Sequence, residues 1–154
     1  MASVTQTLPS AHQSLFEAKA KSGYTFEQLA QRMGRSEVWV AAVFYAQAKP
    51  TPEDLQKLAN ILGVSSSVLK KDLGEHFYPE RGLGKMPPSD ALLYRLYEII
   101  QVYGYPLKSV IHEKFGDGIM SAIAFEAHVD KVEKDGSDYV KLSFLGKWLP
   151  YAKF

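Results

Sequence analysis

The first half of the chain repeats one pattern, a short segment with apolar residues at helical spacing that ends in a glycine. Between residues 10 and 74, leucine, alanine, valine and phenylalanine recur every three or four positions, which places them on one face of an α-helix. Thr25 is followed by Gln28 at the spacing of a capping box, and Gly23 and Gly34 end two of the segments. The pattern predicts five helices, which begin near Ser10, Thr25, Ser36, Pro52 and Ser65.

The second half follows a different pattern. Residues 74–88 contain three prolines and three glycines, a composition typical of a linker. A helix is predicted from Ser89, its expected N-cap, to Gly104. A second helix is predicted from Pro106, because proline suits the first turn of a helix. One or two further helical turns are predicted over residues 119–123.

Strands are expected after these helices. From Phe125 onward apolar and polar residues alternate, Asp135-Gly136 is a hairpin-turn signal, and Gly146 is expected to turn the chain again. A sheet this small buries little apolar area by itself, and exposed strand edges favour pairing with another chain. The expected fold is therefore α+β, with strands that pair with another subunit; the resemblance described below implies that they interlock. Its parts are an all-α unit over 1–75, a linker over 76–88 and a small α+β unit over 89–154.

The composition argues against several classes of protein. The formal net charge is +1 at pH 7, so no basic excess points to nucleic acid. The absence of cysteine excludes disulfides and thiolate metal sites, and the four histidines lack metal-ligand spacing. The N-terminal sequence has no basic region followed by an apolar core, and no apolar run reaches the roughly 18–20 residues that span a membrane. We therefore expect a cytoplasmic protein with no metal and no membrane partner.

Residues 25–64 resemble the DNA-binding domain of lambda-repressor-like regulators, so a helix-turn-helix transcriptional regulator is the alternative function. In such domains the recognition helix reads bases with polar or basic side chains near its N-terminus. Here that helix is SEVWVAAVFYAQA, which opens with Glu37 and is apolar on every side in its middle. Such a helix is buried. We expect Trp39 and Val43 to face a protein partner, and we expect no nucleic-acid binding.

Two features of the second half suit a small anion. In the middle of the predicted helix only Arg95 and Glu98 are charged, and they lie one turn apart on one face. The turn Gly116–Ser121 offers backbone N–H groups and a hydroxyl. Each feature also has an ordinary explanation, since a polar stripe is usually solvated and a glycine turn can simply connect helices. The residues alone indicate a small-anion site with one carboxylate nearby.

The run YRLYEIIQVYGYPLKSVIHEKFGDGIMSAI, residues 94–123, resembles the signature region of cyanases. The similarity extends from the repressor-like helices to the strand-rich tail that ends in LPYAKF. The catalytic Arg, Glu and Ser of that family fall on Arg95, Glu98 and Ser121.

The resemblance implies a reaction and an assembly. Cyanases break cyanate down with bicarbonate to carbamate and carbon dioxide, and the carbamate then gives ammonia, without a cofactor or metal. They assemble as decamers of five dimers with active sites between subunits, which makes the apolar helix an assembly surface. Glu98 is expected to orient Arg95 or to manage a proton. The expected ligands of the substrate anions are the side chains of Arg95 and Ser121 and the backbone N–H groups of Gly118, Ile119 and Met120.

Overall fold

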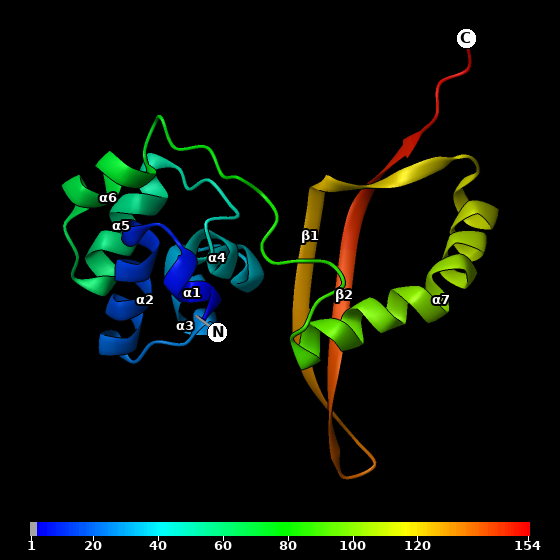
Figure 1. The fold of residues 1–154 in the computed structure, drawn as a ribbon, viewed down its shortest axis with the longest axis horizontal. Coiled ribbons are helices and arrows are strands. Elements are labelled where there is room, and N and C mark those ends of the chain that lie inside the picture. The colour runs from blue at the N-terminus through cyan, green and yellow to red at the C-terminus, as the bar shows by residue number, and fades with distance from the viewer. Residues whose placement is uncertain (1–2) are drawn as a thin grey trace. The chain divides into compact units, whose positions relative to one another are not determined.

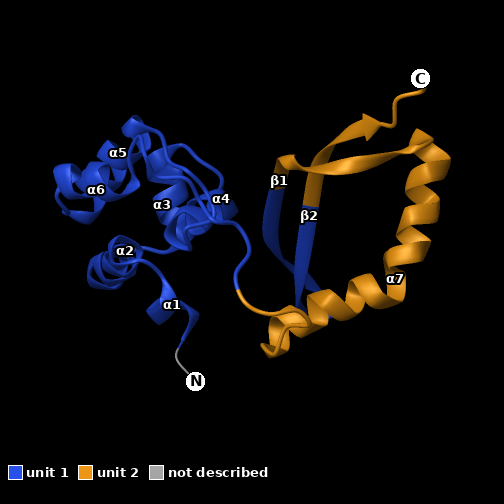
Figure 2. Ribbon diagram, turned by 45° about the horizontal axis from the view of Figure 1, so that its top comes forward, with its two compact units in different colours: residues 1–83, 127–143 blue, residues 84–126, 144–154 orange. Residues whose placement is uncertain are grey.

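The structure, a computed structural model, describes residues 3–154. It divides into two compact units, residues 1–83 with 127–143 and residues 84–126 with 144–154 (Figure 2). Seven helices and one two-stranded sheet make up the described chain (Figure 1). In order they are α1 (Val4–Thr7), α2 (Ser10–Ser22), α3 (Phe26–Met33), α4 (Glu37–Phe44), α5 (Pro52–Leu62), α6 (Ser66–Leu73), α7 (Ala91–Phe115), β1 (Gly118–Lys134) and β2 (Ser137–Pro150).

The five helices predicted for the first half are present as α2 to α6. The Thr25 hydroxyl accepts a hydrogen bond from the Gln28 backbone N–H at 3.1 Å, as the capping box predicts. Glycines at the C-caps of α2, α3 and α5 adopt the left-handed conformation, which costs glycine little. Two details differ from the prediction. Ser10 is the first residue of α2 and Pro9 is its N-cap, and the four-residue α1 precedes it.

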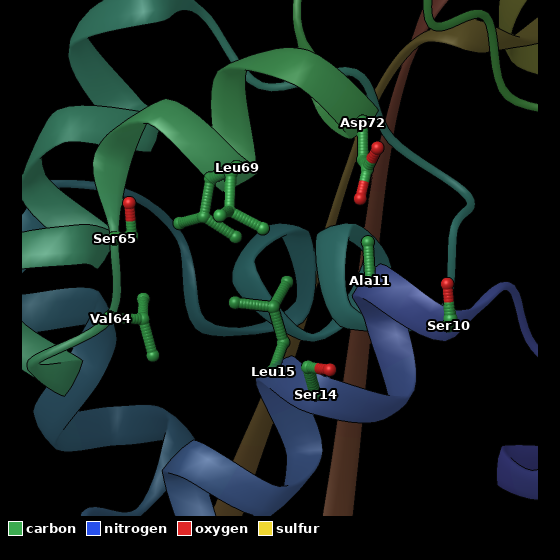
Figure 3. Close-up of a pocket in the computed structure, with 9 residues that line it drawn as sticks. Ser10, Ala11, Ser14, Leu15, Val64, Ser65, Leu69 and Asp72 are labelled. Atoms are coloured by element: carbon green, nitrogen blue, oxygen red, sulfur yellow. The ribbon is translucent and has the colours of Figure 1, made fainter.

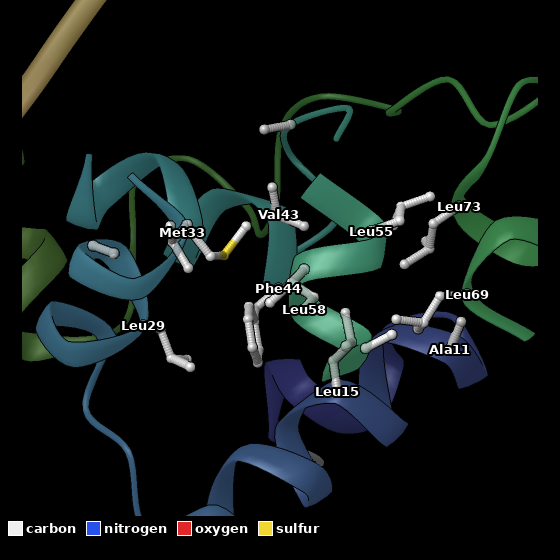
Figure 4. Packing of buried hydrophobic residues seen from close by; sticks show 14 residues of the cluster. Ala11, Leu15, Leu29, Met33, Val43, Phe44, Leu55, Leu58, Leu69 and Leu73 are labelled. Atoms are coloured by element: carbon white, nitrogen blue, oxygen red, sulfur yellow. The ribbon is translucent and has the colours of Figure 1, made fainter. Parts of the chain in front are cut away.

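The helical part of the chain, α2 to α6, buries its own core. Side chains from α2 to α6 meet in one apolar cluster (Figure 4). Complete burial of each leucine contributes about 1.5–3 kcal/mol to the free energy of folding. Contacts among α2 to α6 therefore stabilise this group of helices. The largest members with almost no exposed surface are Phe44, Leu15, Leu29, Met33, Leu55, Leu58 and Leu73.

One expectation about α4 is wrong. Val43 does not face a partner but lies in the core, fully buried beside Val40 and Phe44. Residues three apart share a helix face, so Val43 follows Val40 inward. Trp39 is partly buried against the same core, and the rest of its ring remains exposed.

The first part of the predicted linker is attached to the helical part. The Gln47 side chain accepts a hydrogen bond from the Gly82 N–H at 2.8 Å and donates one to the Glu80 carbonyl at 3.3 Å. The Phe77 ring lies 5.5 Å from the ring of the buried His12, measured between centroids. These contacts fix the linker as far as Gly82.

α7 is a single helix where the sequence predicts two. Pro106 lies inside it, and the helix changes direction in its middle (Figure 1). An interior proline removes one N–H and crowds the preceding turn, so this helix bends instead of ending. Its N-cap is Asp90 rather than Ser89. The Asp90 carboxylate accepts a hydrogen bond from Leu93 N at 2.9 Å, where the helix dipole favours negative charge.

β1 and β2 form a long hairpin. Asp135 and Gly136 have positive φ of 53° and 71°, as a tight hairpin turn requires, so the predicted turn is confirmed. The helical turns predicted over residues 119–123 are wrong, because β1 begins at Gly118 rather than at Phe125. Residues 119–123 form a strand because they pair with the end of β2. Figure 1 shows β1 bending sharply in its first half.

Candidate functional site

Arg95 and Glu98 lie one turn apart near the start of α7 and form an ion pair. Arg95 Nη1 donates to Glu98 Oε2 at 2.7 Å, with the two side chains 70% and 46% exposed. The hydrogen bond to Glu98 and the charge of that carboxylate raise the pKa of Arg95. This is the one hydrogen bond of the guanidinium to any residue in 3–154, so most of its five N–H donors are free to hold an anion.

The helix around this pair is apolar but unburied. No residue of α7 is buried, and monomeric proteins rarely expose so much contiguous apolar surface. A partner chain over this helix would exclude water around Arg95 and strengthen its attraction to an anion. The exposed apolar residues of α7 include Leu92, Leu93, Ile99, Ile100, Val102, Tyr103, Leu107 and Val110.

Ser121 lies in β1 and is 7% exposed. Its hydroxyl oxygen accepts hydrogen bonds from the backbone N–H groups of Ile123 and Ala124, both at 3.0 Å. Side-chain bonds to N–H groups two and three residues ahead hold a local turn in the backbone. A hydroxyl has two acceptor positions and one donor, so with both lone pairs used Ser121 retains one proton to donate.

Gly146 supports the Ser121 segment, a role that the sequence analysis missed. It lies within β2 instead of turning the chain. A Cβ there would lie 2.5 Å from the Ser121 carbonyl oxygen and 2.5 Å from Met120 Cγ, so only glycine permits this approach. Gly118 is constrained in the same way, because a Cβ would lie 2.7 Å from the Trp148 ring. An isolated glycine within a strand pattern is the signal that indicates such close approach.

The backbone N–H groups expected to bind an anion belong to a strand and not to a helical turn. Gly118 is buried, and Ile119 and Met120 are 49% and 44% exposed. Successive N–H groups of a strand point to opposite sides, so a single anion cannot meet all three. Any anion beside Ser121 can use alternate N–H groups only.

The candidate residues form two groups within one chain. Arg95 and Glu98 contact each other, whereas no hydrogen bond or ion pair within residues 3–154 joins either of them to Ser121. All three belong to the same compact unit.

A hollow of about 490 Å³ adjoins the start of β1, and no cluster of metal ligands lies there. Among residues 3–154 there is no group of three or more His, Cys, Asp or Glu side chains suited to a metal ion. Within the same range no helix has the length and apolarity needed to cross a bilayer. The hollow is lined by Lys108, Ser109, His112, Gly116 and Asp117.

The basic residue next to the predicted recognition helix is held by a buried carboxylate. Arg35, the basic residue before α4, donates from Nε and Nη2 to the carboxylate of Asp54 at 2.9 and 3.1 Å. Asp54 is almost fully buried. Burial raises the pKa of Asp54, but hydrogen bonds from Arg35 and Thr51 outweigh it and leave the pKa lowered. An arginine held by a buried carboxylate is not free to contact phosphate, which argues against the regulator.

Comparison with known proteins gives consistent matches to both halves. The cyanate lyase C-terminal domain family matches residues 85–153, and a helix-turn-helix domain family matches residues 15–70. Cyanate hydratase of Laccaria bicolor is 52% identical over 96% of this chain and 89% of its own length. Cyanate hydratase of Coprinopsis cinerea is 50% identical over 98% of this chain and 100% of its own. The crystal structure of cyanase from T. urticae has a TM-score of 0.78 and 35% identity, and covers 92% of this chain and 97% of that one.

Proposed function

The chain belongs to the cyanate hydratase family, and from that premise we propose that it decomposes cyanate with bicarbonate as the second substrate. The observation that carries the proposal is the Arg95–Glu98 pair, which lies on an otherwise apolar helix within the matched cyanate lyase domain. The DNA-binding alternative is not supported, since the relatives that match nearly the whole chain are cyanate hydratases and Arg35 is bound to the buried Asp54.

The proposed reaction joins two anions. A bicarbonate oxygen attacks the cyanate carbon and forms a C–O bond, giving a dianion. The bicarbonate proton moves to nitrogen, the bond between the former bicarbonate carbon and the attacking oxygen breaks, and carbon dioxide leaves. Uptake of one further proton at nitrogen gives carbamate. Carbamate takes up a second proton and splits into ammonia and a second carbon dioxide. The catalyst must therefore hold two negative charges together, which proximity and preorganised positive charge provide.

Arg95 supplies that positive charge in our proposal. Its raised pKa keeps the guanidinium protonated, and its planar fork of donors matches carboxylate-like anions. Glu98 orients it through the 2.7 Å bond. A free carboxylate would repel anionic substrates, and pairing with Arg95 offsets that repulsion. The same proposal gives Glu98 an alternative role, the transfer of a proton to the cyanate nitrogen.

Ser121 acts as a hydrogen-bond donor. The bonds from Ile123 and Ala124 occupy its acceptor positions, which leaves its proton for a substrate oxygen and disfavours a role as a base. Backbone N–H groups among Gly118, Ile119 and Met120 add donors beside it. We propose that the anions lie between this segment and Arg95 of a different subunit.

Assembly completes the site in this proposal. The exposed apolar side chains of α7, and the lack of a hydrogen bond between Arg95 and Ser121 within residues 3–154, support active sites between subunits. We propose a decamer of five dimers with interlocked C-terminal strands. In it residues 1–75 serve assembly, 76–88 link, and 89–154 carry catalysis and dimerisation. We further propose a cytoplasmic enzyme that uses no metal or cofactor and binds neither nucleic acid nor membrane.

Ammonia release from cyanate by the purified protein tests the function. We expect release that depends on added bicarbonate and is lost when bicarbonate is removed from degassed buffer. Ammonia release that does not depend on bicarbonate would contradict the proposed second substrate and indicate simple hydrolysis of cyanate. No release from a folded, assembled protein would contradict the proposed function.

A further inference from the structure

A groove of about 410 Å³ lies between α2 and α6, outside the candidate site (Figure 3). Leu15 and Leu69 are buried in its wall, and Val68 beside them is 54% exposed. Asp72 stands at one end and Ser65 at the other (Figure 3). The groove thus combines an apolar interior with one carboxylate at its end. Asp72 forms no ion pair within residues 3–154.

The segment 151–154, which follows β2, is extended and uncovered. Tyr151 is 61% exposed and Phe154 is fully exposed. The Tyr151 N–H donates to the Asp117 carbonyl at 3.3 Å. Beyond that bond, no hydrogen bond, ion pair or ring contact joins residues 152–154 to another part of the described chain. The Phe154 ring and the Lys153 ammonium are therefore available to a surface outside this segment.

We propose that the groove of each subunit receives residues 151–154 of a second copy. The sizes agree: α6, with eight residues, rises about 12 Å over its length at roughly 1.5 Å per residue, and four extended residues span about 13 Å. Because side chains of an extended segment alternate, Ala152 and Phe154 face the apolar interior. Lys153 then faces the rim, where Asp72 lies.

Charge supports this pairing, since Lys153, like Asp72, has no ionic partner within residues 3–154. The choice of a second copy rests on the assembly in the proposed function. The groove itself lies outside the proposed catalytic residues, so its occupancy can be tested without measuring turnover.

Disulfide trapping in the full-length protein tests the contact. The chain has no cysteine, so the variant Ser14→Cys/Ala152→Cys contains only the two introduced thiols, one in the groove and one in the segment. Gln31→Cys/Ala152→Cys is the matched control, because Gln31 is exposed on α3 and does not line the groove. After mild oxidation we expect chains joined covalently on a non-reducing gel for the groove variant and not for the control.

Other outcomes would overturn the proposal. Equal joining in both variants means random collision. A faster-migrating single chain means that the segment closes onto its own subunit. No joining means that another segment fills the groove. Asp72→Lys in the groove variant should reduce the yield, and adding Lys153→Asp should restore it. Ammonia release is measured in parallel, so loss of the contact and loss of cyanate decomposition are separate results.

Discussion

The helical part of the chain and α7 differ in how they bury apolar side chains. Leu29 and Leu58 are 0% exposed within α2 to α6, whereas α7 buries none of its residues. Both segments are amphipathic by sequence, so the difference lies in their partners. The helical part holds its partners within one chain. α7 leaves many apolar side chains exposed, and in the proposed assembly other chains cover them.

This difference connects stability with chemistry. Arg95 and Glu98 lie on the element whose burial is incomplete, and an exposed ion pair of this kind contributes little to stability. The same pair gains electrostatic strength once water is excluded. Substitutions in the helical part should therefore affect folding, and substitutions on α7 should affect activity or assembly.

The largest effect is expected for Arg95→Ala. Loss of the guanidinium removes the charge that holds two anions together, and turnover should fall by at least about 10²–10³-fold. Unfolding by urea and the oligomer size should not change, because the Arg95–Glu98 ion pair contributes little to stability. Arg81→Ala, at an exposed linker position, is the control. Activity like that of the unsubstituted protein in Arg95→Ala would contradict the assigned role.

The next largest effects are expected from replacing a buried leucine of the helical part and an exposed leucine of α7. Leu58→Ala removes a fully buried side chain and should lower the free energy of unfolding by about 2–5 kcal/mol. Leu93→Ala, on exposed α7, should instead shift the oligomer to smaller species on dilution. Urea unfolding and size-exclusion chromatography at two protein concentrations measure both effects. A concentration-independent loss of several kcal/mol in Leu93→Ala would show that α7 is buried within its own chain.

Ser121→Ala should cost less than the loss of Arg95. One hydrogen bond to an anion contributes about 1.5–3 kcal/mol, which corresponds to roughly 10–150-fold in kcat/KM. Ser121→Thr keeps a hydroxyl and should recover part of the activity. Equal losses in both variants would contradict a role for the hydroxyl, because Ser121→Thr retains it. Far-UV circular dichroism then serves as the control for the strand.

The sequence predicts the helical part well because its signals are local. Capping boxes and C-cap glycines define helix ends within a few residues, and five helices follow from them. The same logic is wrong for α7 and β1. Pro106 resembles a helix start, and residues 119–123 resemble a short helical segment. Both predictions are wrong because the contacts that determine these segments come from distant residues. Trp148 and Leu149 of β2 pack onto Gly118, which no local pattern indicates.

The site follows the same division. Arg95 and Glu98 are neighbours on a helix, so their ion pair follows from their spacing and is present. The support of Ser121 by Gly146 joins residues 25 positions apart and was missed. Family resemblance identified Ser121 where local reasoning offered only a turn with a hydroxyl.

His12 gives the smallest effect and tests whether the helical part is self-contained. Its ring is buried, with Nδ1 3.0 Å from the Val43 carbonyl and Nε2 without a partner in the described chain. Burial lowers the pKa of His12 from its ordinary 6.5. The unfolded chain therefore binds a proton at a higher pH than the folded chain. Stability contributed by the neutral ring is present above pH 6.5 and is lost as the pH falls toward the folded pKa.

Urea unfolding between pH 7.5 and 5.5 measures this loss. Below pH 6.5 we expect a decrease of up to about 1.4 kcal/mol per pH unit. His12→Gln should flatten it, because the amide can still donate to the Val43 carbonyl but does not titrate. His76→Gln, at an exposed position, should leave it unchanged. The loss should also be the same at different protein concentrations, since every contact of the His12 ring lies within one chain. A pH dependence that survives in His12→Gln would assign it to another group, and one that varies with concentration would place the titrating group at a subunit contact.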